Sequence, residues 1–346
     1  MNLKRAILPL SMTLCVSTGA MAMNVETVTE GLDTPWGMTF VDNHTLVVTE
    51  RNGDINAVDL NTHKQKTLLS VPQVFHQGHG GLLDVAQSPF DKNTLYFTYS
   101  KNVDGQGATT LAAATYKDGK ISNFHDLLVT DSRTTTSVGF GSRITFDDNS
   151  VYFSVGDRGV AEHAQNTLTH AGSILRLMPD GSIPNDNPFV NDDAVRDEIW
   201  SYGHRNIQGL AYDAKTESLW SVEHGEHKGD ELNLIKKGSN FGWPLVSGQQ
   251  HQDGLEQPVK VFNEVIAPSS LVIYYGENYS ELNGKLLVSS LVQQDVLTIK
   301  VDDHQKVTSQ QEILNTLKER VRDIEVSQSG EIYLSTDNGN IYHLSK

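Results

Sequence analysis

The sequence predicts an all-β chain folded as a six-bladed β-propeller, and three observations support that fold class. Helical periodicity is nearly absent after residue 22, whereas short β-branched and aromatic runs recur between Asp, Asn and Gly turns. One two-strand unit occurs six times along the chain. Its second strands start 49, 56, 68, 67 and 46 residues apart, which is close to the length of a four-stranded propeller blade.

Each of the six copies of this unit has a first strand and a second strand. The first strands begin near Trp36, Leu82, Ser142, Gln208, Ser270 and Arg322, and the second strands begin near Leu46, Leu95, Val151, Leu219, Leu286 and Ile332. We expect the terminal strands, Val25–Glu30 and Asn340–Leu344, to pair and close the ring.

A pair of β-sandwiches is the alternative, but no Pro- or Ser-rich linker divides the chain. The long connections 102–135 and 156–200 are expected to carry binding loops.

Residues 1–22 have the composition of a secretory signal peptide. The stretch starts with two basic residues, continues as an apolar run and ends in small residues at Ala20 and Ala22. A buried N-terminal helix is the alternative. Cleavage after Ala22 would remove the one cysteine, Cys15, and leave residues 23–346 as a single propeller domain. The expected location is the periplasm.

The composition excludes several classes of protein. The chain has 346 residues, 27 of them basic and 43 acidic, and a net charge of −16. Because phosphate binding needs clustered Lys and Arg, we expect no nucleic acid and no anionic membrane surface as the main partner. No segment after residue 22 is apolar for long enough to span a bilayer. One cysteine builds neither a disulfide framework nor a Cys-based zinc site.

Four polar clusters lie at strand ends or in loops, at 76–81, 156–159, 201–209 and 223–231. In the first, glycines beside His76 and His79 allow close approach of a ligand to the backbone, and a tight turn is the alternative. In the second, Asp157 follows a very apolar strand, which suits an orienting carboxylate or a base, unless the segment is an ordinary turn. In the third, the Arg205 guanidinium and neighbouring amides suit a planar, oxygen-rich anion, with a solvated loop as the alternative.

The fourth cluster has the oxygen ligands of a hard cation. Carboxylates, glycine carbonyls and the nearby segment 240–244 favour Ca²⁺, whereas His224 and His227 offer a weaker hint of zinc. Further on, Arg320 and Arg322 point to the same face of a strand. They are expected either to clamp a carboxylate or to form a surface ion pair.

These segments together resemble the soluble pyrroloquinoline-quinone (PQQ)-dependent aldose sugar dehydrogenases of the glucose/sorbosone dehydrogenase family. The resemblance extends over essentially the whole chain after residue 22. Its motifs are Thr34-Pro35-Trp36-Gly37, Gly80-Gly81-Leu82-Leu83-Asp84, Gly141-Ser142-Arg143, Val155-Gly156-Asp157-Arg158-Gly159, Gly181-Ser182-Ile183-Pro184-Asn185-Asp186-Asn187-Pro188, Gly203-His204-Arg205-Asn206, Asn240-Phe241-Gly242-Trp243-Pro244 and Arg320-Val321-Arg322-Asp323.

The resemblance implies a six-bladed propeller that binds PQQ and Ca²⁺ and oxidises the C1 hydroxyl of aldose sugars by hydride transfer to the quinone. It implies that Asp157 orients the catalytic base and that Arg205, with Asn206 beside it, stabilises the reduced quinone. Arg320 and Arg322 would clamp the cofactor. The implied partners are a sugar and an electron acceptor that the sequence does not identify.

The metal ligands are also implied by the resemblance. The backbone carbonyls of Gly225 and Glu226 would hold the calcium that bridges to the quinone. A second, structural calcium would use the carboxylate of Glu231 and the carbonyl of Phe241. Glu226 stands where the family has proline, and a carbonyl is still available there.

Four further positions depart from the family pattern. Gly139 stands at the position of the base histidine, His79 replaces a glutamine that binds PQQ, and Val292 replaces a lysine that binds PQQ; an aromatic residue near the substrate falls on Asn263. Two hypotheses follow. Either His79 or a nearby loop histidine is the substitute base beside Asp157, or the propeller binds a saccharide or protein ligand without turnover.

Overall fold

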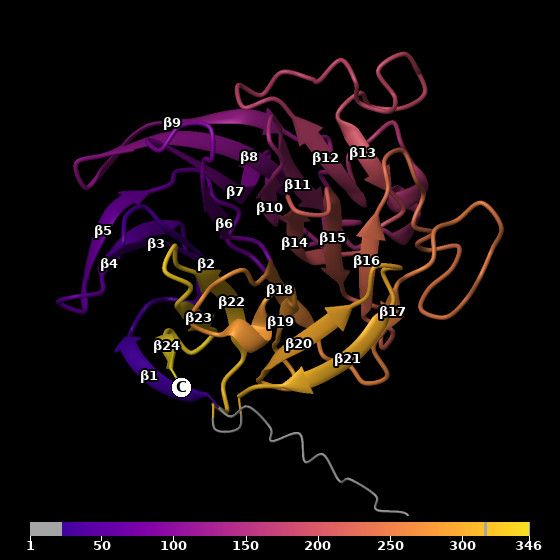
Figure 1. Ribbon diagram of the computed structural model, residues 1–346. Coiled ribbons are helices and arrows are strands. Elements are labelled where there is room, and N and C mark those ends of the chain that lie inside the picture. Colours follow the sequence, from indigo (N-terminus) through magenta and orange to yellow (C-terminus); the bar gives the residue numbers. More distant parts are fainter. Residues whose placement is uncertain (1–22, 315–316, 346) are drawn as a thin grey trace, which may run out of the picture.

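The computed structural model describes residues 23–314 and 317–345, and it is a six-bladed β-propeller (Figure 1). The six four-stranded sheets succeed one another around a common axis as the chain colour runs from indigo to yellow. Within the described residues, the helical elements are two short 3-10 turns, η1 (Ala161–Gln165) and η2 (Ser280–Leu282). None of the helices in this described part is long and apolar enough to cross a bilayer.

Each blade runs from an inner strand at the axis to an outer strand at the rim. Blade 1 contains β2 (Pro35–Phe40), β3 (Thr45–Glu50), β4 (Asp54–Asp59) and β5 (Lys64–Ser70). Blade 2 contains β6 (Leu82–Gln87), β7 (Thr94–Val103), β8 (Gln106–Lys117) and β9 (Lys120–Val129). Blade 3 contains β10 (Ile144–Phe146), β11 (Val151–Val155), β12 (Ser173–Leu177) and β13 (Ile199–Tyr202).

The second half of the ring follows the same order. Blade 4 contains β14 (Ile207–Asp213), β15 (Ser218–Glu223), β16 (Glu231–Ile235) and β17 (Lys260–Val261). Blade 5 contains β18 (Pro268–Ile273), β19 (Leu286–Ser290), β20 (Val296–Val301) and β21 (Val307–Glu312). Blade 6 contains β22 (Val321–Val326), β23 (Ile332–Thr336), β24 (Ile341–Ser345) and, as its outer strand, β1 (Asn24–Thr29).

The ring closes by pairing the two ends of the described chain, as the sequence predicts. β1 runs antiparallel to β24, with Asn24 opposite Ser345 and Val25 opposite Leu344. The six pairs of inner strands also begin within two residues of their predicted positions. The all-β, six-bladed prediction is therefore confirmed, and the alternative of two sandwiches is wrong.

The expectation for the two long connections is wrong in large part. Segment 102–135 contains all of β8 and β9, the outer strands of blade 2, and it contributes no residue to the axial cavities described below. Segment 156–200 contains β12 and the start of β13. Its first residues alone, Asp157, Gly159 and Ala161, line a cavity.

Apolar side chains fill the spaces between neighbouring blades. Between blades 1 and 2, for example, Val47 and Ile55 pack in one cluster with Leu82 and Phe97, and none of the four is exposed. Because both faces of these strands are covered, apolar surface is removed from water on both sides. Each Å² buried in this way stabilises the fold by about 25 cal/mol. The inner strands are consequently held rigidly around the axis, and the residues at their ends lie in fixed positions.

Candidate functional site

The inner strands all begin at one end of the axis, and a cleft opens there. It consists of two adjoining cavities of about 240 and 350 Å³, which share His79, Asn206, His224 and Ala267 in their walls. We call the two together the axial cleft. Eight of the residues that the sequence predicts for the site line this cleft: Asp157, Arg205, His79, Asn206, Arg320, Arg322, Gly225 and Glu226.

Four guanidinium groups surround the axial cleft, although the chain as a whole is strongly acidic. They belong to Arg51, Arg205, Arg320 and Arg322. The Nε atoms of Arg51 and Arg205 are buried and have no hydrogen-bond partner among the described residues. Because a buried donor without a partner is costly, these atoms indicate that the cleft is built to receive an acceptor.

Asp337 holds two of these arginines. Its carboxylate receives hydrogen bonds from Arg322 Nε and Nη2, at 2.7 and 3.0 Å, and from Arg320 Nε at 2.8 Å. The ion-pair interpretation of this pair is confirmed, whereas the clamp on a ligand carboxylate stays a prediction. The two arginines form ion pairs with Asp337, and both also line the axial cleft.

Arg205 is positioned by its neighbours on blade 4. Its backbone N–H donates to Glu223 Oε2 at 2.8 Å, and its guanidinium lies 5.5 Å from the centre of the Trp243 ring. The neighbouring Asn206 uses its side-chain oxygen to accept the Gly141 N–H at 3.1 Å. Asn206 thus fixes the loop before blade 3 as well as lining the cleft.

His79 stands between the two cavities and remains solvent-accessible. Its backbone N–H donates to Ser137 O at 2.7 Å, which places it beside the segment that contains Gly139. Partial burial of the imidazole lowers the pKa of His79 below its usual value, and the positive charges of nearby arginines, led by Arg51 and Arg322, lower it further. The imidazole is consequently neutral at neutral pH, the form that accepts a proton.

Asp157 lies directly against Gly139. Its Oδ2 accepts the indole N–H of Trp243 at 2.9 Å, and its Oδ1 accepts the Gly159 N–H at 2.9 Å. Burial raises the pKa of Asp157. A Cβ atom at Gly139 would lie 2.7 Å from Asp157 Oδ1, and Gly139 has a φ of +64°, so a histidine here would have to displace the carboxylate.

Arg158, the neighbour of Asp157, does not face the cleft. Its guanidinium is fully buried 3.4 Å from the centre of the Phe140 ring and donates to the carbonyl oxygens of Gly107 and Thr136. Burial lowers its pKa to about 10. Arg158 therefore holds the loop that carries Gly139.

The residues expected to hold calcium occupy two neighbouring places. Gly225 and Glu226 line the axial cleft, whereas Glu231 and Phe241 line a separate cavity of about 20 Å³ together with Glu223. Burial, and then the negative charge of Glu223, raises the pKa of Glu231 to about 8. Two facing carboxylates with a nearby carbonyl are the hard-oxygen donors that Ca²⁺ prefers.

No group of three or more His, Cys, Asp or Glu side chains in the described part of the chain has the geometry of a metal site. A calcium ion here would therefore depend on backbone carbonyls. The zinc hint gains no support, because His224 Nε2 is hydrogen-bonded to Pro268 O at 2.8 Å.

The axial cleft fits a flat anion. The Trp36 and Trp243 side chains line its walls and supply flat apolar surface, and the four guanidinium groups supply positive charge. By contrast, Val292 is 52% exposed and Asn263 is exposed, and neither lines the cleft. The lysine contact with PQQ that the resemblance implies is therefore not made by Val292, the residue at that position.

Arg51 lines the cleft but is not among the site residues predicted from the sequence. A signal was available, because Arg51 directly follows β3, just as Gly156 and Asp157 directly follow β11. Equivalent positions in a repeat lie at the same end of the axis. Comparing the ends of the second strands would have found it.

Three comparisons with known proteins agree with this architecture. A family model described as glucose/sorbosone dehydrogenase matches residues 32–343. The aldose sugar dehydrogenase YliI of Escherichia coli is 32% identical over 351 residues, which cover 94% of this chain and 94% of that protein. A crystal structure of the soluble aldose sugar dehydrogenase of E. coli in the apo-form is 31% identical, covers 93% of this chain and 99% of its own, and has a TM-score of 0.88.

A solved structure described as PQQ-bound is also similar. The aldose sugar dehydrogenase of Streptomyces coelicolor is 27% identical, with a TM-score of 0.80 and coverage of 94% of this chain and 98% of its own. The region that the family model matches includes blades 1 to 5 completely and most of blade 6, whose outer strand β1 lies before residue 32. The chain therefore belongs to the glucose/sorbosone dehydrogenase family.

Proposed function

We propose that the protein is a PQQ- and calcium-dependent oxidoreductase that oxidises the C1 hydroxyl of aldose sugars. The observation that carries this proposal is the axial cleft, which is lined by four guanidinium groups, a neutral histidine and, in the same cavity as the histidine, a buried carboxylate. The chain's relatives with sugar dehydrogenase names support the same reaction class. When bound, PQQ would supply the acceptor for the hydride that leaves C1 of the sugar.

The residues of this chain would hold such a cofactor by charge and shape. Arg205, Arg320 and Arg322 would bind its carboxylate and quinone oxygens, with Asn206 beside them. The buried, unpartnered Nε of Arg205 gives a donor without competition from the protein. The Gly225 and Glu226 carbonyls would hold calcium at the edge of the same cleft.

His79 is the group we assign as the base in this mechanism. Its imidazole is neutral because the pKa is lowered, so a ring nitrogen is free to take the proton of the sugar hydroxyl. After that transfer, the imidazolium would be stabilised by Asp157, the carboxylate that lines the same cavity. The sugar proton would thus go to Nδ1 or Nε2 of His79, and the bound quinone would supply the acceptor for the hydride.

We also propose a periplasmic location, with residues 1–22 as a signal peptide and residues 23–346 as the mature propeller. Residues 1–22 lie outside the described part of the chain, so this proposal rests on their composition. The sugar is the small-molecule partner, and the electron acceptor stays unassigned.

The test is a titration of the mature protein with PQQ, in calcium and in a chelator, followed by an assay with aldoses and a reducible dye. We expect micromolar or tighter binding in calcium, weaker binding in the chelator, and dye reduction with at least one aldose. Calcium at 100 times its dissociation constant should also stabilise the fold by about 2.7 kcal/mol in a thermal melt. Absence of PQQ binding would overturn the oxidoreductase assignment, and binding without dye reduction would favour a propeller that binds without turnover.

A further inference from the structure

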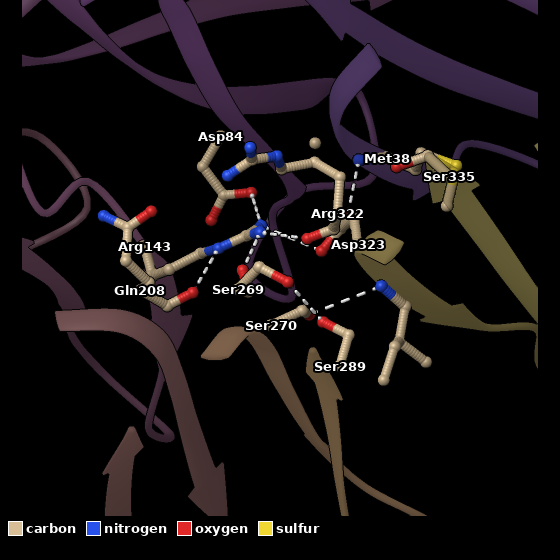
Figure 2. A network of polar contacts seen from close by, with 12 residues as sticks. Met38, Asp84, Arg143, Gln208, Ser269, Ser270, Ser289, Arg322, Asp323 and Ser335 are labelled. Carbon is tan, nitrogen blue, oxygen red and sulfur yellow. Dashed lines mark hydrogen bonds and ion pairs between the residues drawn. The ribbon is translucent and has the colours of Figure 1, made fainter. Parts of the chain in front are cut away.

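One guanidinium group on the propeller axis contacts all six blades. Arg143, directly before β10 of blade 3, donates through Nη1 to Asp84 of blade 2 at 2.9 Å and to Asp323 of blade 6 at 2.8 Å. Its Nε donates to the carbonyl oxygen of Gln208 in blade 4 at 2.9 Å, and its Nη2 donates to that of Ser269 in blade 5. Figure 2 shows these groups converging on the Arg143 side chain.

The contact with blade 1 is made through an aromatic ring. The Arg143 guanidinium carbon lies 4.2 Å from the centre of the Trp36 ring. Arg322 approaches the same ring at 5.9 Å, and Arg143 Nη2 donates to the Arg322 carbonyl oxygen at 3.1 Å. Trp36 and Arg322 both line the axial cleft, whereas Arg143 itself does not.

The strands that Arg143 joins are the strands that carry the candidate site. Asp84 lies five residues after His79, and Gln208 lies three residues after Arg205. Asp323 follows Arg322 directly. The relative positions of the base and of the cleft arginines therefore depend on strands that meet at one buried side chain, which is 4% exposed.

The arginines of the cleft repel one another, because like charges at short range are unfavourable. Asp337 balances only Arg320 and Arg322, and it lies at one side of the cleft. The contacts of Arg143 restrain Arg322 and Trp36 against this repulsion. Arg143 donates to the backbone carbonyl oxygen of Arg322, and its guanidinium group lies against the Trp36 ring.

We propose that Arg143 is a positioning residue that sets the spacing of Arg322 and Trp36 in the axial cleft and thereby its affinity for a planar anion. The identity of that anion as PQQ rests on the proposed function, but the spacing itself does not. A planar fork with five donors is needed for this role, because lysine offers one charged nitrogen and cannot reach three carbonyl oxygens and two carboxylates together.

The test compares Arg143→Lys with a matched control, Arg176→Lys. Arg176 is also a buried arginine of blade 3, 8% exposed and paired with two aspartates, but it lines neither cavity of the cleft. Lysine keeps the positive charge in both variants, so Asp84 and Asp323 keep a counter-ion. Thermal melts of both variants establish how much each substitution destabilises the fold.

Two measurements decide the proposal. In calorimetric titration with PQQ and calcium, we expect Arg143→Lys to weaken binding about tenfold, because a displaced Arg322 would lose one charge-assisted contact with the ligand. Arg176→Lys should bind as the wild type does. The kcat at saturating PQQ should change less than the dissociation constant. Crystal structures of the two variants should show Trp36 and Arg322 displaced in Arg143→Lys alone.

Wild-type affinity in Arg143→Lys, or an unmoved Trp36 and Arg322, would overturn the positioning role. An equal loss of affinity in both variants would also overturn it, because general loss of rigidity would then explain the effect. If the wild-type protein itself fails to bind PQQ, the proposed function fails, and the crystal structures alone decide whether Arg143 sets the spacing.

Discussion

The two ends of the propeller axis differ sharply in charge, although the same six strands form both. At the end where these strands begin, the axial cleft is lined by four arginines. At the other end, a cavity of about 220 Å³ is lined by Asp84, Asp323 and Glu325. Arg143 lines this second cavity as well, and its guanidinium group is bound to the first two of these carboxylates.

The difference shows how one ring of strands supports two environments. Trp36 and Arg322 line the cleft, and residues one to three positions further along the same strands, such as Thr39 and Asp323, line the opposite cavity. In the acidic cavity, burial and the charges of Asp323 and Asp84 raise the pKa of Glu325 to about 8. Positive charge is thus concentrated in the cleft, although the chain has a net charge of −16, whereas the cavity at the other end is lined by carboxyl groups whose pKa values are raised.

The largest expected effect concerns the cleft. His79→Gln keeps a hydrogen-bonding side chain but removes the group that takes a proton, so kcat with an aldose should fall about 10²- to 10⁴-fold. His76→Gln, in the same loop and outside both cavities, is the matched control and should keep wild-type kcat. Steady-state dye reduction measures both. Full activity in His79→Gln would assign the proton transfer to another group.

The next prediction compares variants at the two ends of the propeller axis. Arg322→Ala should weaken PQQ binding about 10- to 100-fold, because one charge-assisted contact is lost while Arg320 still pairs with Asp337. Glu325→Gln at the opposite end should leave the dissociation constant unchanged. Calorimetric titration gives both values. A similar loss in the two variants would mean that the ends of the axis do not act separately.

The smallest effect is on the pH dependence of stability. The folded-state pKa of Glu325 is about 8, above its ordinary value of 4.5, so the folded protein binds more protons than the unfolded protein between these pH values. Its contribution should therefore destabilise the fold as pH rises, by up to about 1.4 kcal/mol per pH unit. Glu325→Gln should reduce this slope while still accepting the Phe40 N–H.

Urea unfolding at pH 5, 6, 7 and 8 measures the slope for the wild type and the variant. Asp84, whose pKa is raised to about 6 by burial, contributes in the same direction at lower pH and stays in both proteins. Parallel curves for the two proteins would show that Glu325 titrates near its ordinary pKa.

Most of the fold could be predicted because the inner two strands of each blade have a strong pattern. Val151–Val155, for example, is buried along its whole length and is apolar or aromatic at four of five positions. The outer strands have a weaker pattern, since β9 has no buried residue and β8 is rich in Ala and Thr. That is why segment 102–135 was expected to be a loop.

The site was predictable as a set of loops but not as a geometry. The motifs place Arg205 and Asp157 at strand ends, and the structure brings them to one cavity. The contacts of Arg143 with Asp323, 180 residues away, depend on ring closure and have no local pattern in the sequence. The same holds for the close approach of Asp157 to Gly139, which leaves no room for a Cβ atom at position 139.

The join between β1 and β24 has a consequence for how the chain is made. The first strand belongs to the blade whose other three strands are the last to be synthesised. During translation, β1 therefore has no partner until residues 341–345 have left the ribosome, and the sixth sheet is completed only then. We expect a chain that stops short of β24 to expose two unpaired strand edges, a form prone to aggregation and to degradation by quality-control proteases.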